Sequence, residues 1–103
     1  MILAILFAMS ALGQGGRLTD CGECVCMEDT MSCDHVDVVA VPDIGPRRVQ
    51  IRKLGLQNTD IAALPLNLTM LFPNLRLVVV SRLDGQCVLV PFVYPNVQVK
   101  GKI

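Results

Sequence analysis

Apolar positions along the chain follow two different patterns. Residues 2–12 form an apolar run that only Ser10 interrupts. From Ile51 onward, apolar and polar residues instead alternate over short stretches separated by Pro and Gly. Alternation with a period of two predicts short, half-buried strands. No stretch after residue 17 keeps a helical period for long, and the best candidate, residues 63–72, contains Pro65. The pattern therefore predicts a strand-rich body behind an apolar N-terminal segment.

The strand-rich body contains an internal repeat. The stretch "FPNLRLVVV" (Phe72–Val80) is echoed by "YPNVQVKG" (Tyr94–Gly101), at an offset of 22. A second set of apolar residues recurs at an offset of 24, with Ile51, Leu54 and Leu56 followed by Leu75, Val78 and Val80. Periods in the twenties with this apolar spacing indicate leucine-rich repeats, whose coils stack to bury a common core. We therefore expect a mainly β solenoid fragment with irregular or short helical returns.

The repeat predicts where each coil places its side chains. Parallel strands are expected near residues 52–57, 76–81 and 97–101. In the first coil Leu54 and Leu56 are expected to point inward, and Thr59 to lie at a turn where a buried hydroxyl bonds backbone groups. The rest of the core of this coil is expected to come from Ile61, Leu64, Leu71 and Phe72. Two later positions fit poorly, because Leu83 occupies the polar turn position and Lys100 falls where a leucine is expected.

The segment before the repeat, residues 35–51, is rich in valine. Its sequence "HVDVVAVPDIGPRRVQI" alternates and is broken by Pro42, Gly45 and Pro46. This composition predicts short strands or a hairpin in preference to a helix.

The apolar N-terminal run is too short to cross a bilayer, which needs about 20 residues in a helix. It matches the apolar region of a secretory signal peptide, and "ALG" places small residues before a cut after Gly13. Residues 1–13 are therefore predicted to be a signal peptide, and a cut as late as residue 16 also fits. A buried N-terminal helix or strand is the alternative.

Four cysteines lie within "CGECVCMEDTMSC", residues 21–33. They can bind a metal, run redox chemistry or form two disulfides, for which three pairings exist. A Cys24–Cys26 bond closes a strained ring, which disfavours one pairing and leaves two open. A zinc site with His35 as a spare ligand is the alternative, but a secreted chain enters an oxidising compartment that favours disulfides. The fifth cysteine, Cys87, is expected to be unpaired or to link two chains in a dimer.

The cysteine motif and the segment after it resemble a known family. The spacing C-x2-C-x-C-x6-C is followed by "VDVVAVPDIGPRRVQIRKLGLQNTDIAALP". That order resembles the N-terminal cysteine cap (LRRNT) of extracellular leucine-rich-repeat proteins, and the spacing is similar to that of small leucine-rich proteoglycans. The resemblance covers residues 21–80. It implies a cap over residues 17–46 with disulfides Cys21–Cys26 and Cys24–Cys33, then two repeats and a partial third over residues 47–103. It also implies a secreted or cell-surface module that binds proteins or matrix components through a concave β-face.

Charge divides the chain although its net charge is zero. Seven of the nine acidic residues lie within residues 17–43 with one basic residue, whereas eight of the nine basic residues lie within residues 44–103 with two acidic ones. The candidates for contact with a partner on the outer side of the predicted strands are Arg52, Lys53, Arg76 and Arg82. They suit an acidic partner such as a sulfated glycan, and an ordinary solvated surface is the alternative.

Signatures of catalysis are missing from the sequence. His35 is the only histidine, and no phosphate-binding glycine loop follows the leader. We expect no enzymatic activity, cofactor, nucleic-acid partner or transmembrane segment. The triplet "NLT" at Asn67–Thr69 is a glycosylation acceptor on the back of the first coil if the chain is secreted. Two other functions stay open, namely a small disulfide-stapled secreted effector or structural peptide and, less favoured, a cysteine-rich zinc-binding module.

Overall fold

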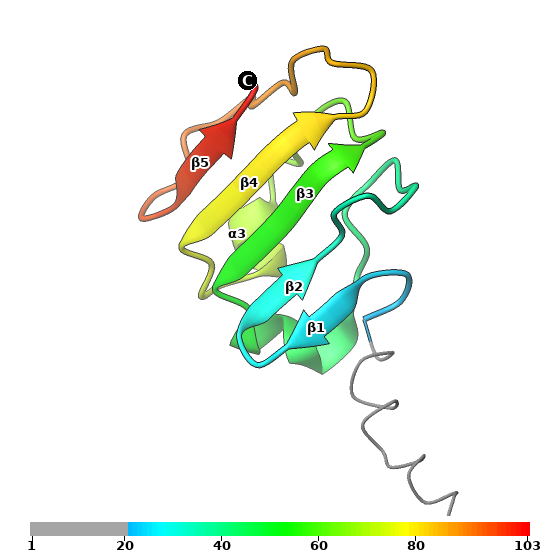
Figure 1. Ribbon diagram of the computed structural model, residues 1–103. Helices are drawn as coiled ribbons and strands as arrows, with labels where there is room; N and C mark the ends of the chain where they lie inside the picture. The colour runs from blue at the N-terminus through cyan, green and yellow to red at the C-terminus, as the bar shows by residue number, and fades with distance from the viewer. Residues whose placement is uncertain (1–20) are drawn as a thin grey trace, which may run out of the picture.

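The computed structural model describes residues 21–103, so the predicted signal peptide lies outside the described residues. One five-stranded sheet runs through this part of the chain in the order β1-β2-β3-β4-β5 (Figure 1). The strands are β1 (Val25–Met27), β2 (Thr30–Ser32), β3 (Lys53–Thr59), β4 (Leu77–Arg82) and β5 (Gln98–Gly101). Two short helices accompany them within residues 21–103, the 3-10 helix η1 (Gly45–Gln50) and the α-helix α3 (Leu68–Leu71). Neither is long and apolar enough to cross a membrane.

Strand pairing follows the repeat in the sequence. β1 and β2 form an antiparallel hairpin, and β2, β3, β4 and β5 are parallel neighbours. Leu54 lies opposite Val78 and Leu56 opposite Val80, so the longer of the two predicted offsets is confirmed as the register of β3 and β4. Between these strands the chain returns through α3, which lies behind the sheet in Figure 1. The predicted strands near residues 52–57 and 76–81 therefore match β3 and β4.

The last strand pairs one residue out of the register that the echo predicts. The echo in the sequence has an offset of 22, but Val99 lies opposite Val78 and Lys100 opposite Val79. The poor fit of Lys100 to a leucine position is explained by this change of register. Lys100 is exposed, and Val99 packs against the core in its place. In the connection before β5, Asn96 lies in the left-handed region at φ 62°, which asparagine tolerates better than most residues.

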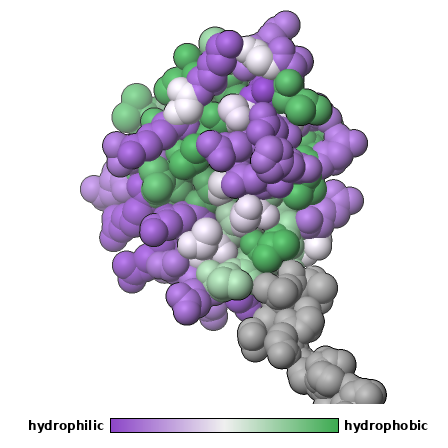
Figure 2. Space-filling model, viewed as in Figure 1, coloured by the Kyte–Doolittle hydropathy of each residue, from purple (hydrophilic) through white to green (hydrophobic). Residues whose placement is uncertain are grey.

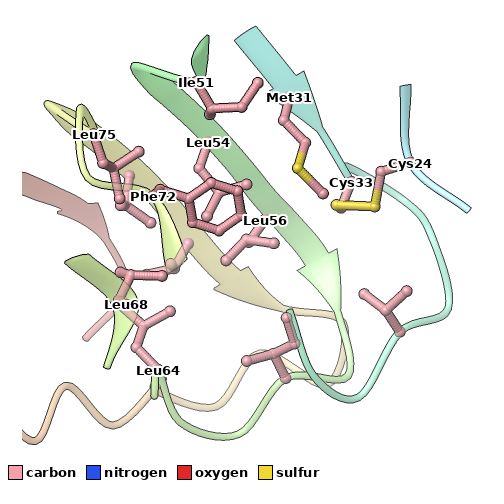
Figure 3. Close-up of a cluster of buried hydrophobic side chains, with 14 of the residues drawn as sticks. Cys24, Met31, Cys33, Ile51, Leu54, Leu56, Leu64, Leu68, Phe72 and Leu75 are labelled. Carbon is pink, nitrogen blue, oxygen red and sulfur yellow. A yellow bond between two sulfur atoms is a disulfide. The ribbon is translucent and has the colours of Figure 1, made fainter. Parts of the chain in front are cut away.

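The hydrophobic core lies between the sheet and the returning chain. An inward row of side chains, none more than 1% exposed, crosses four strands at Cys26, Met31, Leu54 and Val78. Leu68 and Phe72 come from the α3 side and are also buried. Figure 3 shows the Phe72 ring between α3 and the inward side of β3. Burial of each such side chain contributes about 1.5–3 kcal/mol, so this layer is the main source of stability.

The segment before β3 folds differently from the prediction. Strands or a hairpin were expected over residues 35–51, but irregular chain leads there into η1. Pro46 lies in the first turn of η1, where its missing N–H is not needed and its fixed φ favours a helix. Val38 and Ile44 are buried, whereas Val39 is exposed. The alternating pattern therefore reflects which side chains face the core. The segment nevertheless forms no strand, because it has no partner strand.

Thr59 forms the buried polar turn that the sequence predicts. Its side chain is 1% exposed, and its Oγ1 donates to the carbonyl oxygen of Leu56 at 3.4 Å and accepts the Ile61 N–H at 3.3 Å. The second coil does not repeat this turn. The β3–β4 register shifts after Leu56, so Thr59 lies opposite Arg82 and Leu83 is left exposed. Thr59 is therefore the one buried polar side chain at a coil turn in residues 21–103.

Replacing Thr59 with valine keeps the shape of the side chain but removes the hydroxyl that accepts the Ile61 N–H and donates to the Leu56 carbonyl oxygen. We expect Thr59→Val to lower the free energy of unfolding by about 1–3 kcal/mol, measured by urea denaturation. Thr30→Val is the matched control, because the Thr30 hydroxyl is half-exposed and bonds the neighbouring Asp29 carboxylate at 3.2 Å. The control is expected to change stability by less than about 0.5 kcal/mol. Equal losses in both variants would contradict this role for Thr59.

Candidate functional site

The candidate site is the outward face of the sheet, the surface opposite α3 that is turned to the viewer in Figures 1 and 2. Side chains alternate across a strand, so the neighbours of the inward row point outward. One outward row consists of Met27, Thr30, Lys53, Leu77 and Gln98, and the next of Val25, Ser32, Gly55, Val79 and Lys100. Strand pairing holds these positions in a fixed grid, so the outward face is a surface of defined side-chain spacing.

Apolar side chains occupy the middle of the outward face. Leu77 and Val79 of β4 are half-buried, with Lys53 and Gly55 on one side and Gln98 and Lys100 on the other. Figure 2 shows hydrophobic residues in the middle of this face, bordered by hydrophilic ones. The face therefore offers a short apolar strip, Leu77 and Val79, with polar borders, an arrangement typical of protein interaction surfaces.

Gly55 creates a shallow hollow beside this strip. The hollow has a volume of about 280 Å³ and is bordered by Thr30, Asp34, Lys53, Gln57 and the strip residues. The Asp34 carboxylate occupies the space above Gly55 and accepts the Gln57 N–H at 2.8 Å. A Cβ atom on residue 55 would lie 2.8 Å from Asp34 Oδ1, closer than such atoms approach. Glycine at this position thus allows a cap residue to place its carboxylate on the outward face.

The four predicted basic residues do not form one cluster. Arg52, Lys53 and Arg76 lie together where β3 and β4 begin, and the Arg76 N–H donates to the Arg52 carbonyl oxygen at 2.8 Å. Arg82 lies at the other end of β4, about 20 Å away at the rise of a strand. Its guanidinium forms an ion pair with Asp84 at 2.8 Å. The structure brings three of the four residues together and gives the fourth an acidic partner.

Acidic residues gather at the far end of β3, the end away from Lys53. A second hollow, of about 390 Å³, is bordered there by His35, Asp37, Asn58 and Asp60. A hydrogen bond with Asp37, desolvation, and the negative charges of Asp37 and Asp84 raise the pKa of Asp60 above its ordinary value of 3.8, and Arg82 acts in the opposite direction. The Asp60 carboxyl group therefore holds a proton more readily than an isolated one.

This acidic end was not predicted, although the sequence carries one signal for it. Asp60 and Asp84 are separated by the same offset as Leu54 and Val78, so the repeat already placed both at the same end of neighbouring strands. Asp34 and Asp37 were not predictable in the same way. They belong to the loop after the cap hairpin, and their position depends on backbone bonds such as that from the Asp60 N–H to the Val38 carbonyl oxygen, at 3.1 Å.

The cap cysteines form two disulfides, Cys21–Cys26 and Cys24–Cys33. This is the pairing that the family resemblance implied. All four residues are at most 2% exposed and belong to the same core cluster as Leu54 and Val78. Oxidised thiols cannot serve as zinc ligands, and residues 21–103 contain no group of His, Cys, Asp or Glu side chains arranged for a metal. The cysteine cluster is a covalent part of the fold.

Two further predicted positions lie away from the outward face. Asn67 is exposed at the start of α3, on the opposite side of the sheet, where an attached glycan would leave the outward face open. Cys87 is a free, exposed thiol in the connection between β4 and β5. Neither residue belongs to the grid of strand side chains.

Comparisons of the chain with protein-family models, curated proteins and solved structures found no match. The functional interpretation therefore rests on the geometry and charges of the outward face. That face combines a fixed grid, an apolar strip and two hollows, an arrangement suited to binding another molecule.

Alanine at position 55 is expected to displace the Asp34 carboxylate from the Gln57 N–H. We expect Gly55→Ala to lower the free energy of unfolding by about 1 kcal/mol, since a hydrogen bond to a charged group is lost. In an Asp34→Ala background that bond is already absent, so the same change should be neutral or stabilising. Urea denaturation of the four proteins measures this cycle. An equal cost of Gly55→Ala in both backgrounds would refute the contact.

The raised pKa of Asp60 gives a second prediction. Below the ordinary pKa the protonated Asp60 stabilises the fold, and this stabilisation is lost as the pH rises through the raised pKa. Asp37→Asn removes the neighbouring carboxylate and should lower the pKa of Asp60 toward 3.8, measured by carbon-detected NMR titration. Asp43→Asn is the control, because Asp43 bonds the Gly45 N–H in a different part of the cap. An unchanged titration of Asp60 in the Asp37 variant would show that the two residues do not interact in solution.

Proposed function

We propose that this chain is a secreted or cell-surface leucine-rich-repeat module with a disulfide-bonded N-terminal cap. It binds an extracellular protein or a matrix component through the outward face of its sheet and carries out no catalysis. The observation that supports this most is the parallel register of β3 and β4, which follows the repeat in the sequence and places Leu54 on Val78 in the core. Stacked coils with a period in the twenties are the building units of leucine-rich-repeat solenoids.

The cap supports the same proposal. A solenoid needs cover over the apolar end of its first coil. Here the β1–β2 hairpin takes that place, with Met31 opposite Leu54 and both side chains buried. The two disulfides fit an oxidising compartment, which agrees with a signal peptide in residues 1–13 and with a glycan on Asn67.

The alternative functions receive less support. A stapled peptide depends on its disulfides and has little core outside them, but the buried cluster extends from Cys21 through the repeat to Tyr94. A zinc module needs reduced thiols, and four of the five cysteines are in disulfides. A repeat module that binds through its sheet accounts for both observations.

The proposed function is tested by a charge placed on the apolar strip. The Leu77→Glu variant puts a carboxylate in the middle of the outward face, whereas Met70→Glu puts the same group on α3, where Met70 is 75% exposed. The full chain is tested by surface plasmon resonance against purified fibrillar collagen, fibronectin, laminin and heparin. We expect binding to at least one of these ligands, weakened about tenfold or more by Leu77→Glu because central contacts dominate interfaces. The Met70 variant should bind as the parent does.

If the Leu77 and Met70 variants bind every ligand equally well, the outward face is not the binding surface. Urea denaturation of both variants shows whether a loss of binding comes from unfolding.

A further inference from the structure

We propose that the free edge of β5 pairs with β5 of a second copy of this chain. The two strands run antiparallel about a two-fold axis that passes between the two Val99 residues. β5 is the last strand of the sheet in residues 21–103, and Figure 1 shows it at one border of the sheet. This edge is separate from the outward face, so the inference goes beyond the function proposed above. The dimer joins two sheets into one and covers the open end of each core.

The core is open at β5. The inward row of side chains that crosses the sheet continues from Val78 to Val99. From Cys26 to Val78 the row is at most 1% exposed, whereas Val99 is partly exposed although it packs against the core. Val90 and Val97 of the same coil are likewise packed against the core and partly exposed. Since the end of a solenoid needs cover, a partner at this edge gains apolar burial.

The outer edge of β5 carries backbone groups that have no partner strand in the described residues. The Gln98 N–H donates to the Arg76 carbonyl oxygen at 2.9 Å, so Gln98 bonds toward β4. Backbone groups of successive strand residues point to opposite sides, so those of Val99 and Gly101 point away from β4. Natural edges are often protected by proline or by an inward charge. Residues 98–101 contain no proline, and their one charged side chain, Lys100, lies in the outward row.

Charge selects one register for the pairing of two β5 strands. Three antiparallel registers place Val99 and Gly101 opposite each other or opposite themselves. With Val99 opposite Gly101 the two Lys100 side chains meet, and with Gly101 opposite Gly101 each Lys100 meets a Lys102. With Val99 opposite Val99, Lys100 lies opposite Gln98 instead. Like charges directly opposite each other are destabilising, so the last register is the favoured one.

A second copy of the chain fits this edge for two physical reasons. The chain has nine basic and nine acidic residues, so two copies do not repel each other through net charge. The two-fold axis also places the Val99 side chains of the two copies together, and the inward row of Leu54, Val78 and Val99 continues into the second core. One contact thus covers two open ends. A two-fold interface is closed, so association stops at the dimer.

A cysteine at the two-fold axis tests this register. The full chain, produced by secretion, carries Val99→Cys in a Cys87→Ser background, which removes the free thiol. Residues in a hydrogen-bonded antiparallel pair have Cα atoms about 5.5 Å apart, which a disulfide spans. We expect most of the chain to oxidise to a dimer on a non-reducing gel. Lys102→Cys in the same background should stay monomeric although Lys102 is exposed, because its two copies would be about 20 Å apart along the strands.

An inward charge at the same position tests the dimer without a covalent bond. The Val99→Lys ammonium group reaches water in the monomer but is buried in the dimer. We expect sedimentation equilibrium to show a dimer of the parent chain and a dissociation constant at least tenfold higher for Val99→Lys. Val36→Lys is the matched control, because Val36 is also partly exposed, packs against the core and lies beside Cys33 in the cap. It should change the dissociation constant less than about twofold.

Three results would overturn the proposal. One is a parent chain that stays monomeric up to about 100 μM. Another is a dimer that Cys87→Ser dissociates and that forms no bond through Val99→Cys, which would assign the contact to Cys87. The third is a series of assemblies larger than the dimer, which would assign it to pairing of β5 with β1.

These failures are distinct from a failure of the proposed function, which occurs when no matrix ligand depends on Leu77. Urea denaturation shows whether Val99→Lys folds. If it does not fold, the comparison of Val99→Cys with Lys102→Cys decides the proposal.

Discussion

The parallel pairing of β3 with β4 is the interaction on which the rest of this structure depends. Because Leu54 lies beside Val78, the inward side chains of two coils meet in one layer, and Phe72 can cover that layer from behind. The same pairing fixes what points outward. Lys53 must lie beside Leu77 and Gly55 beside Val79, so the core and the outward face are two consequences of one register. A slip of one residue in this pairing would turn the core side chains outward and the outward side chains into the core.

The β1–β2 hairpin solves a different physical problem, which is the apolar edge of the core beside β3. A three-residue hairpin strand has too few hydrogen bonds to hold its place alone. The Cys21–Cys26 disulfide, with a sequence separation of 5, ties β1 to the chain before it, and Cys24–Cys33, with a separation of 9, joins the residue before β1 to the residue after β2. Met31 then fills the space beside Leu54 without exposing it to water. Covalent bonds here replace the large core that a chain of this size lacks.

The repeat unit was predictable from the sequence because core positions recur at a fixed offset, as Leu54 and Val78 do. Features that depend on one local conformation were not. The alternation over residues 35–51 predicted strands that do not form, since the pattern does not show whether a partner strand exists. The position of Lys100 was not predicted because β5 pairs with β4 at an offset one residue shorter than the sequence echo. The acidic end was not predicted because its residues come from two separate segments, the loop after the hairpin and the end of β3. Only the folded backbone brings these segments together.

The antiparallel direction of β1 gives the sheet a fixed beginning, and each later strand adds to the same edge in parallel. A further strand inserted after β4 in the register of β3 and β4 would place its inward side chains beside Val78 and Val80. It would lengthen the face by about 4.8 Å, the spacing of neighbouring strands, and leave the cap unchanged. Gene duplication can therefore change the span of this surface in discrete steps. Contacts near the cap, such as Asp34 above Gly55, would stay constant through such changes.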